Sequence, residues 1–190
     1  MTSIYREDTT FEKEDFAQGA LPAGEYENCT FADCDFSNAD LGGVKFFECE
    51  FTGCNLSLAK LTGTSFRDVR FKDCKMLGLR FEDCNEFGLS FGFDNCALDH
   101  SSFYQTKIKQ TVFKKSQLRE TDFTGADLTG AVFENCDLRR AAFAGTIIEK
   151  ADFRTALNYS IDPDNNRLKK ARFAMPGVAG LLDKYDILID

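Results

Sequence analysis

A five-residue period in large apolar residues restricts the fold of this chain more than any other feature of its sequence. These residues recur at every fifth position from Phe11 to Phe81 and then, after a shift of two residues, from Phe93 to Phe153. All 28 positions of the two runs are apolar. An α-helix repeats every 3.6 residues and a strand every 2, so neither keeps a five-residue period on one side. A chain that turns a corner every five residues does keep these residues on one side, which is the inside of the turn.

A second position in each pentad is also restricted. Two residues before each apolar centre, the residue is small in 25 of the 28 pentads, and Glu14, Leu79 and Phe91 are the exceptions. One large and one small inward side chain per pentad would fill a narrow interior, while the other three residues face outward. Four-sided coils of this kind stack with their backbones about 4.8 Å apart.

The pattern therefore predicts an all-β solenoid of about seven to eight coils. We expect a lead-in at residues 1–10, the repeat at residues 11–173 and a C-terminal cap at residues 174–190. Residues twenty apart then stack in columns, and the apolar centres form a core ladder that includes Phe31, Phe51, Phe71, Phe113, Phe133 and Phe153.

Residues 126–130, Ala-Asp-Leu-Thr-Gly, show the clearest form of the motif: a small residue, Asp or Asn, Leu or Phe, and two variable residues. In this motif the chain resembles the pentapeptide-repeat proteins over residues 11–153, and it is most like the Qnr and MfpA type that confers quinolone resistance. The resemblance implies a right-handed quadrilateral β-helix. It bears on the fold much more than on the function, because one fold hosts many functions.

The repeat changes phase within residues 82–92. Strict continuation would place Glu86 inside, where an unpaired carboxylate is costly. A two-residue bulge, eased by glycines, avoids this cost. Two interpretations remain open. One is a tolerated kink, which we favour because so short an insertion presents little surface. The other is a local interaction site that includes Glu86, Phe87 and Phe91.

The C-terminal residues follow a different pattern. Pro176 suits the first position of a helix, and apolar residues then recur at helical spacing. Residues 186–190 are typical of a short strand. We expect this helix and strand to cap the open edge of the last coil. The ending also resembles that of the Qnr type, which implies a C-terminal homodimer through Leu181, Leu182, Tyr185, Ile187, Leu188 and Ile189.

All eight cysteines occupy the small inward position, and Cys34, Cys54 and Cys74 share one column. Their side chains should point the same way, so we expect reduced thiols that act as small apolar side chains rather than disulfides. The sequence has no Cys-x-x-Cys motif and no Cys/His spacing typical of zinc. It therefore predicts no metal and no cofactor.

Nothing in the sequence indicates catalysis. The single histidine, His100, falls at an outward position, and no nucleotide-binding or zinc-protease motif occurs. A rod with a filled interior also lacks the cleft that catalysis uses. Residues 1–10 are polar, and no stretch approaches the roughly 18 apolar residues of a membrane span. We therefore expect a non-enzymatic cytoplasmic protein that enters no membrane.

The charge of the chain is negative and uneven. The net charge of -8 disfavours direct binding of nucleic acid. Residues 1–50 hold 12 acids and 3 bases, whereas bases cluster at residues 67–80 and 107–119. A rod that imitates the charge of duplex DNA would need a continuous acidic stripe, and these bases interrupt it.

Two functions remain open. One is a scaffold that binds an unidentified protein partner through outward apolar residues such as Phe47, Leu58, Leu77 and Tyr104. The other is implied by the resemblance to Qnr proteins: a DNA mimic that binds the type II topoisomerases DNA gyrase and topoisomerase IV and protects them from quinolones. We favour the scaffold slightly, because fold-level resemblance is a weak guide to function.

Overall fold

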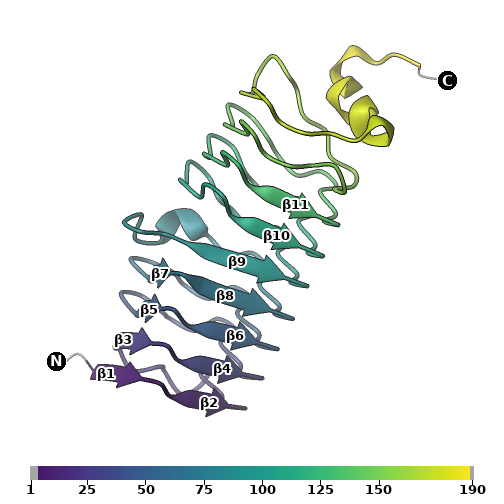
Figure 1. Ribbon diagram of the computed structural model, residues 1–190. Helices are drawn as coiled ribbons and strands as arrows, with labels where there is room; N and C mark the ends of the chain where they lie inside the picture. Colours follow the sequence, from purple (N-terminus) through teal and green to yellow (C-terminus); the bar gives the residue numbers. More distant parts are fainter. Residues whose placement is uncertain (1–3, 189–190) are drawn as a thin grey trace.

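The computed structural model describes residues 4–188, which form a rod of stacked coils with the two chain ends at opposite ends of the rod (Figure 1). Its strands are short. They are β1 (Ile4–Glu7), β2 (Thr10–Glu12), β3 (Gly24–Glu27), β4 (Thr30–Ala32), β5 (Lys45–Phe47), β6 (Glu50–Thr52), β7 (Ser65–Arg67), β8 (Val69–Lys72), β9 (Phe91–Asp94), β10 (Val112–Lys114) and β11 (Val132–Glu134).

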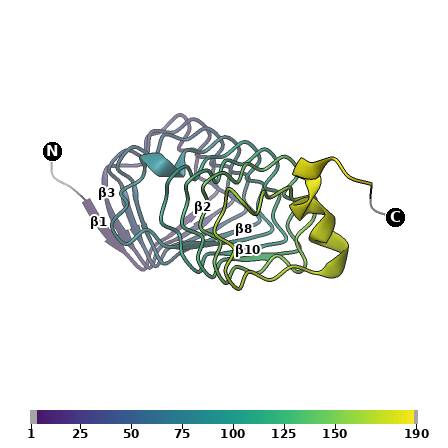
Figure 2. The ribbon, with the colours of Figure 1, turned by 90° about the horizontal axis from the view of Figure 1, so that it is seen from above.

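The strands make two parallel sheets along the rod, in the orders β1-β3-β5-β7 and β2-β4-β6-β8-β9-β10-β11. Phe31 pairs with Phe11 on one side and with Phe51 on the other, so one coil takes 20 residues. Isolated parallel bridges, such as the one from Asp35 to Asn55, join the coils elsewhere. The chain is therefore a parallel β-solenoid of about seven turns, as the period predicts. Figure 2 shows the same coils from above, one behind another.

Strand β1 lies within the segment that the sequence suggested as a lead-in. It pairs with β3 from Ile4–Gly24 to Glu7–Glu27, so the first coil begins before Phe11. Arg6 stands in the column of Tyr26 and is exposed at the end of the rod. On this first side of the coil Arg6 takes the place of an apolar centre, and its position is open to solvent.

A column of stacked phenylalanine rings runs the length of the rod. Successive ring centroids lie 4.6–5.4 Å apart, which matches the spacing of paired strands, and the ring planes lie within 25° of parallel. The six residues of the core ladder are all buried in this column. The whole column consists of Phe11, Phe31, Phe51, Phe71, Phe93, Phe113, Phe133, Phe153 and Phe173.

Hydrogen bonds at the corners explain the Asp or Asn of the motif. The Asp35 carboxylate accepts a bond from the N–H of Ser37 at 2.8 Å, and this bond lowers the pKa of Asp35. Such bonds to a residue two positions later favour a turn. The next residue, Asn38, has a left-handed φ of 58° and donates its N–H to the Ser57 carbonyl of the following coil at 3.0 Å. Each corner is therefore held within its coil and by its neighbour.

The phase shift is visible in the strand register. Phe71 pairs with Phe93, 22 residues away, where other strand pairs are 20 apart. The N–H of Asn85 still bonds the Thr64 carbonyl at 2.9 Å, and that of Ser90 bonds the Phe66 carbonyl at 3.0 Å. The two extra residues therefore lie between these anchors, in a segment that we call the 86–89 loop. A single 3₁₀ turn, η1 (Phe81–Asp83), precedes it.

Phe91 points into the interior and is only 7% exposed. Its ring centroid lies 5.2 Å from that of Phe81 and 6.5 Å from that of Phe66. Because the 86–89 loop turns outward and Leu89 is only partly buried, a large side chain at the small position fills the interior here. Phe91 therefore cannot contact a partner, contrary to its place in the interaction site that the sequence suggested.

The C-terminal cap consists of 3₁₀ helices, η2 (Met175–Leu181) and η3 (Asp183–Tyr185), which lie over the last coil (Figure 1). The Gly180 carbonyl accepts a hydrogen bond from the N–H of Ile161 at 2.9 Å. A Cβ at Gly180 would lie 2.1 Å from the Tyr159 carbonyl oxygen, so only glycine permits this approach.

The expected C-terminal strand differs from the structure. Residues 186–188 form no strand, and residues 189–190 lie outside the described residues. The backbone of Asp186 has a left-handed φ of 49°, which turns the chain out of an extended path.

Replacing Phe113 with Ala should lower the free energy of unfolding by about 3–5 kcal/mol, because the ring stacks on both Phe93 and Phe133. Urea unfolding followed by circular dichroism measures the change. The matched control is Val112→Ala, an outward residue of the same strand, which should cost less than about 1 kcal/mol. Equal losses in the two variants would contradict a core built from this column.

Candidate interaction surfaces

The inward columns fill the interior, and the polar side chains buried within residues 4–188 are all Ser or Thr, so the charged groups of this part of the chain lie toward the outer faces of the rod. Within residues 4–188, no three His, Cys, Asp or Glu side chains are grouped in a way that could hold a metal ion. His100 is exposed, with its Nδ1 3.5 Å from a carboxylate oxygen of Glu120. In the same part of the chain, no helix has the length and hydropathy to cross a membrane.

The eight cysteines are free thiols, and all except the half-buried Cys84 are buried. The Cys49 thiol lies 3.2 Å from the Tyr26 carbonyl oxygen, and the Cys136 thiol lies 3.3 Å from that of Phe113, each in the preceding coil. Burial raises the pKa of both Cys49 and Cys136 to about 12. Because the thiolate is the reactive form, these residues act as small core side chains and not as nucleophiles.

The 86–89 loop places a large apolar side chain on the surface, since Phe87 is 73% exposed. Its ring centroid lies 5.1 Å from the guanidinium carbon of Arg67, and the ring of Phe47 lies 4.8 Å from the same carbon. Glu86 is also exposed. Of the residues suggested for an interaction site at the break, Glu86 and Phe87 thus face outward. Sequence reasoning missed Arg67, although its 20-residue spacing from Phe47 placed the two in one column.

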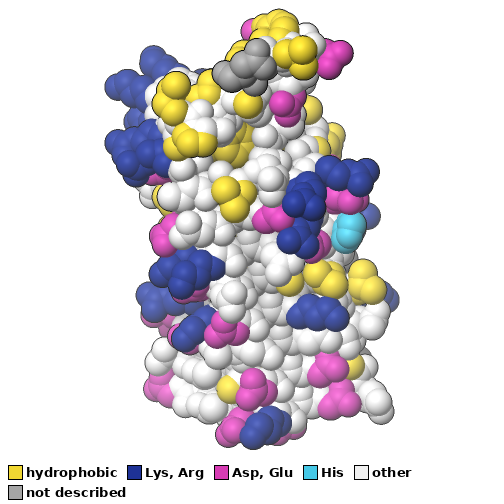
Figure 3. Space-filling view, turned by 90° about the vertical axis from the view of Figure 1, so that its right-hand side faces the viewer, with side chains coloured by type: hydrophobic (Ala, Val, Ile, Leu, Met, Phe, Trp, Pro, Cys, Tyr) yellow, Lys and Arg dark blue, Asp and Glu magenta, His cyan; other side chains and the backbone are white. Residues whose placement is uncertain are grey.

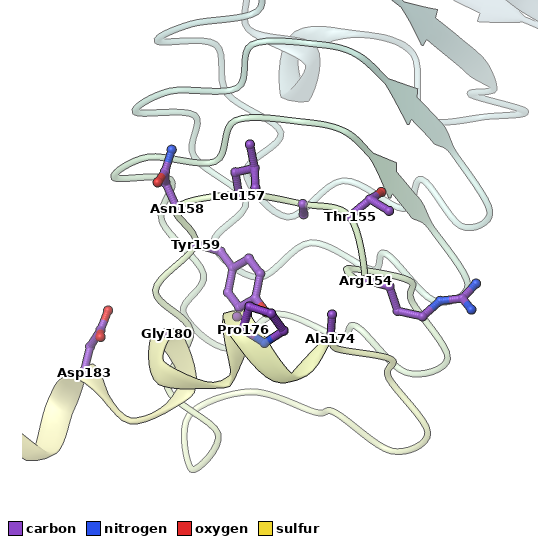
Figure 4. A pocket seen from close by; sticks show the side chains of 11 residues that line it. Arg154, Thr155, Leu157, Asn158, Tyr159, Ala174, Pro176, Gly180 and Asp183 are labelled. Atoms are coloured by element: carbon purple, nitrogen blue, oxygen red, sulfur yellow. The ribbon is translucent and has the colours of Figure 1, made fainter. Parts of the chain in front are cut away.

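A cleft of about 560 Å³ separates the C-terminal cap from the last coil. The Tyr159 side chain lies in it beside Pro176 (Figure 4), and the hydroxyl is buried without a hydrogen-bond partner. Arg154, Asn158 and Asp183 extend in different directions around the cleft (Figure 4). Their polar ends therefore do not converge on one point, as they would in a site for a polar ligand.

Apolar side chains of the cap are exposed beyond this cleft. Leu188 is 96% exposed, and Tyr185 and Ile187 are more than half exposed. Leu181 packs partly against the core, and Leu182 is half-buried. Hydrophobic side chains gather at this end of the rod in Figure 3. Of the residues suggested for a homodimer, Tyr185, Ile187 and Leu188 are thus available, while Ile189 lies outside the described residues.

Charged side chains are arranged by coil along the rod. Many bases pair with acids of the next coil, as in the pairs Arg119–Asp137 at 2.7 Å and Lys109–Asp127 at 3.2 Å. Residues 85–106, about one coil, contain no Lys or Arg, whereas β8 and β10 on either side of β9 carry outward Arg70, Lys72 and Lys114. The face formed by these strands is therefore not continuously acidic.

Together these features define a class of protein, a β-solenoid with a filled interior and only its outer faces available for binding. The family described as "Pentapeptide repeat region" matches residues 24–92 and 89–160. The chain belongs to this pentapeptide-repeat family. Among curated proteins, none matches the chain in sequence.

Two solved structures show the same fold. Full-length QnrB1, described as a plasmid-mediated fluoroquinolone resistance protein, is 18% identical with a TM-score of 0.56, over 96% of this chain and 100% of that one. HetL, a pentapeptide repeat protein involved in heterocyst differentiation regulation from the cyanobacterium Nostoc, is 16% identical with a TM-score of 0.50, over 90% of this chain and 85% of that one. At identities this low, the structural similarity shows a common fold and does not extend to function.

Proposed function

We propose that this protein is a non-enzymatic scaffold that binds another protein through the outer faces of its rod. The observation that carries the proposal is the exposure of large apolar side chains, such as Leu58, Phe87 and Tyr104, on a rod whose interior is already full. Burying one such side chain in a complex contributes roughly 1.5–3 kcal/mol. The eight free thiols fit a reducing compartment such as the cytoplasm.

Leu58 supports this proposal through its backbone. Its φ of 59° is left-handed, and no other apolar residue except glycine has a positive φ within residues 4–188. A bulky side chain in this conformation costs about 1–2 kcal/mol. Strained residues of this kind concentrate at functional sites. Leu58 is also 59% exposed, so burial within its own fold does not offset the cost of this backbone conformation.

The scaffold function predicts that the immobilised protein retains a partner from a cell lysate through these apolar anchors. The variant Leu58→Asn/Phe87→Ser should lose the partner while its melting temperature stays the same or rises, because Asn tolerates a left-handed φ. Lys150→Asn, a corner change in another coil, is the matched control and should retain the partner. Capture of the same proteins by the wild type and the double variant would contradict the proposed anchors.

A second candidate function is binding to a type II topoisomerase and protection of that enzyme from quinolones. The similarity in fold to QnrB1 extends over nearly all of both chains. The net charge of -8, with 12 acids in residues 1–50, supports binding in place of DNA at the N-terminal coils. The bases on β8 and β10 limit such mimicry to this end of the rod.

On this second candidate, the purified protein should restore supercoiling by DNA gyrase in the presence of a quinolone, or inhibit supercoiling, at micromolar concentration. The variant Glu7→Lys/Glu48→Lys reverses exposed charges in the acidic coils and should abolish the effect. Glu134→Lys makes the same change in β11, far along the rod, and should not. No effect of the wild type on gyrase or topoisomerase IV from a matched host would exclude this second candidate, and the scaffold would remain as the proposed function.

We also propose that two rods pair through their C-terminal caps, because Tyr185, Ile187 and Leu188 expose apolar surface that this chain does not cover. Light scattering should then give the mass of a dimer for the wild type and of a monomer for Ile187→Glu/Leu188→Glu. Tyr104→Glu, an exposed change on a distant coil, should remain dimeric. A wild type that is monomeric at high concentration would end the proposal.

A further inference from the structure

Arg67 is held between two aromatic rings on the outside of the rod. Phe47 covers one part of the guanidinium from the neighbouring coil, at 4.8 Å from its central carbon to the ring centroid. Phe87 of the 86–89 loop covers it from the other neighbouring coil at 5.1 Å. Cation–π contacts of this kind favour a guanidinium stacked on the faces of the rings. The side chain therefore has little freedom to reorient.

The 86–89 loop is built to hold Phe87 in this place. The Asn85 side-chain amide donates to the Ser65 hydroxyl at 3.2 Å, and its Oδ1 accepts the N–H of Phe87 at 3.1 Å. After the loop, the Ser90 hydroxyl donates to the Asp68 carboxylate at 3.1 Å. Both ends of the loop are thus bonded to the coil that carries Arg67, so the ring is fixed over the guanidinium.

Gly88 permits the close approach of the loop to Arg67. Its φ of 71° is left-handed, and a Cβ there would lie 3.1 Å from Arg67 Nε. That contact is tighter than most side chains adopt, so with any other residue the loop or the arginine side chain would have to shift by a few tenths of an ångström. The two extra residues at the break therefore do more than absorb a change of phase, because they cover one arginine.

The Arg67 side chain has no hydrogen-bond or ion-pair partner within residues 4–188, and its Nε is buried without an acceptor. Five other arginines on the rod form ion pairs, as in Arg154–Asp152 at 2.6 Å and Arg167–Glu149 at 2.7 Å. With Nε buried and rings stacked on the guanidinium, the terminal nitrogens are the donors that remain for a ligand. A fixed guanidinium loses little freedom when it binds a carboxylate with two parallel hydrogen bonds.

We propose that Arg67, together with Phe47 and Phe87, is a docking site for a carboxylate side chain of the partner protein. The inference rests on the proposed scaffold function and specifies the chemistry of its partner. The exposed ring of Phe87 selects an apolar residue next to that carboxylate. Glu48, Asp68 and Glu86 flank the three residues in sequence, and their charges oppose a phosphate dianion or a nucleic acid more strongly than a single carboxylate.

The test uses a blocked peptide, acetyl-Gly-Leu-Glu-Leu-Gly-amide, and its isosteric Gln form. Titration into the whole protein labelled with nitrogen-15 at arginine follows the Nε–H resonance of Arg67. The Glu peptide should shift this resonance in a saturable way, and the Gln peptide should bind at least about fivefold more weakly, as expected for a lost charge-assisted pair.

Three variants locate the binding, measured by the amide resonances that the peptide shifts in the wild type. Arg67→Lys keeps the charge but loses the planar fork, and Phe87→Ala removes one ring; each should weaken binding of the Glu peptide several-fold. Arg70→Lys changes an exposed arginine that stacks on no aromatic ring of residues 4–188, and it should leave binding unchanged. All three positions face outward, so the backbone amide spectrum should keep its native dispersion.

Several outcomes would overturn the site. Any of three results would show that Arg67 only holds the 86–89 loop in place. These are the absence of any shift, equal binding of the Glu and Gln peptides, and undiminished binding by Arg67→Lys. Tighter binding of a phosphoserine form of the peptide would replace the carboxylate by a phosphate. The titration needs no knowledge of the natural partner, so its failure is distinct from failure of the capture experiment, which also depends on Leu58.

Discussion

Stacking of like side chains between successive coils is the interaction on which the rest of this structure depends. A coil of 20 residues is too small to bury its own apolar centres, and only the coils above and below remove them from water. The spacing of paired strands equals the separation of stacked rings, so backbone pairing and the Phe column reinforce each other. Small residues, with Cys among them, fill most of the remaining slots because little space is left beside the rings, and Leu79 and Phe91 are the buried exceptions.

The break in the repeat shows how strict this constraint is. When the 86–89 loop leaves the interior, Phe91 enters it from a slot that holds a small residue in most other pentads. The coils above and below then continue in an unbroken ladder. The same loop brings Phe87 to Arg67 on the outside. One insertion thus keeps the core filled and creates the most distinctive feature of the surface, which is why a kink and an interaction site are not exclusive alternatives.

The regular part of the fold could be predicted because its rule is local and repeated. The period identified the inward positions, and with them the columns that contain Phe31 and Phe133. Prediction weakened where the repeat ends. Arg6 hid the first side of the first coil, because that position is exposed at the end of the rod and needs no apolar centre. In the cap, helical spacing was correct in kind, but the turns are 3₁₀, Gly180 packs closely on Tyr159, and the left-handed φ of Asp186 turns the chain out of the path expected for a strand.

The sequence by itself determined the solenoid, its coil length and the division of residues into inward and outward sets, because a five-residue period allows few other structures. It also placed Phe47 and Arg67 in one column, since outward residues follow the same register as the core. Only the tertiary structure decided that Phe91 turns inward and that Phe87 lies over Arg67. Those outcomes depend on how the interior is filled at one coil and on how closely Gly88 can approach its neighbour, and no repeating pattern encodes either of them.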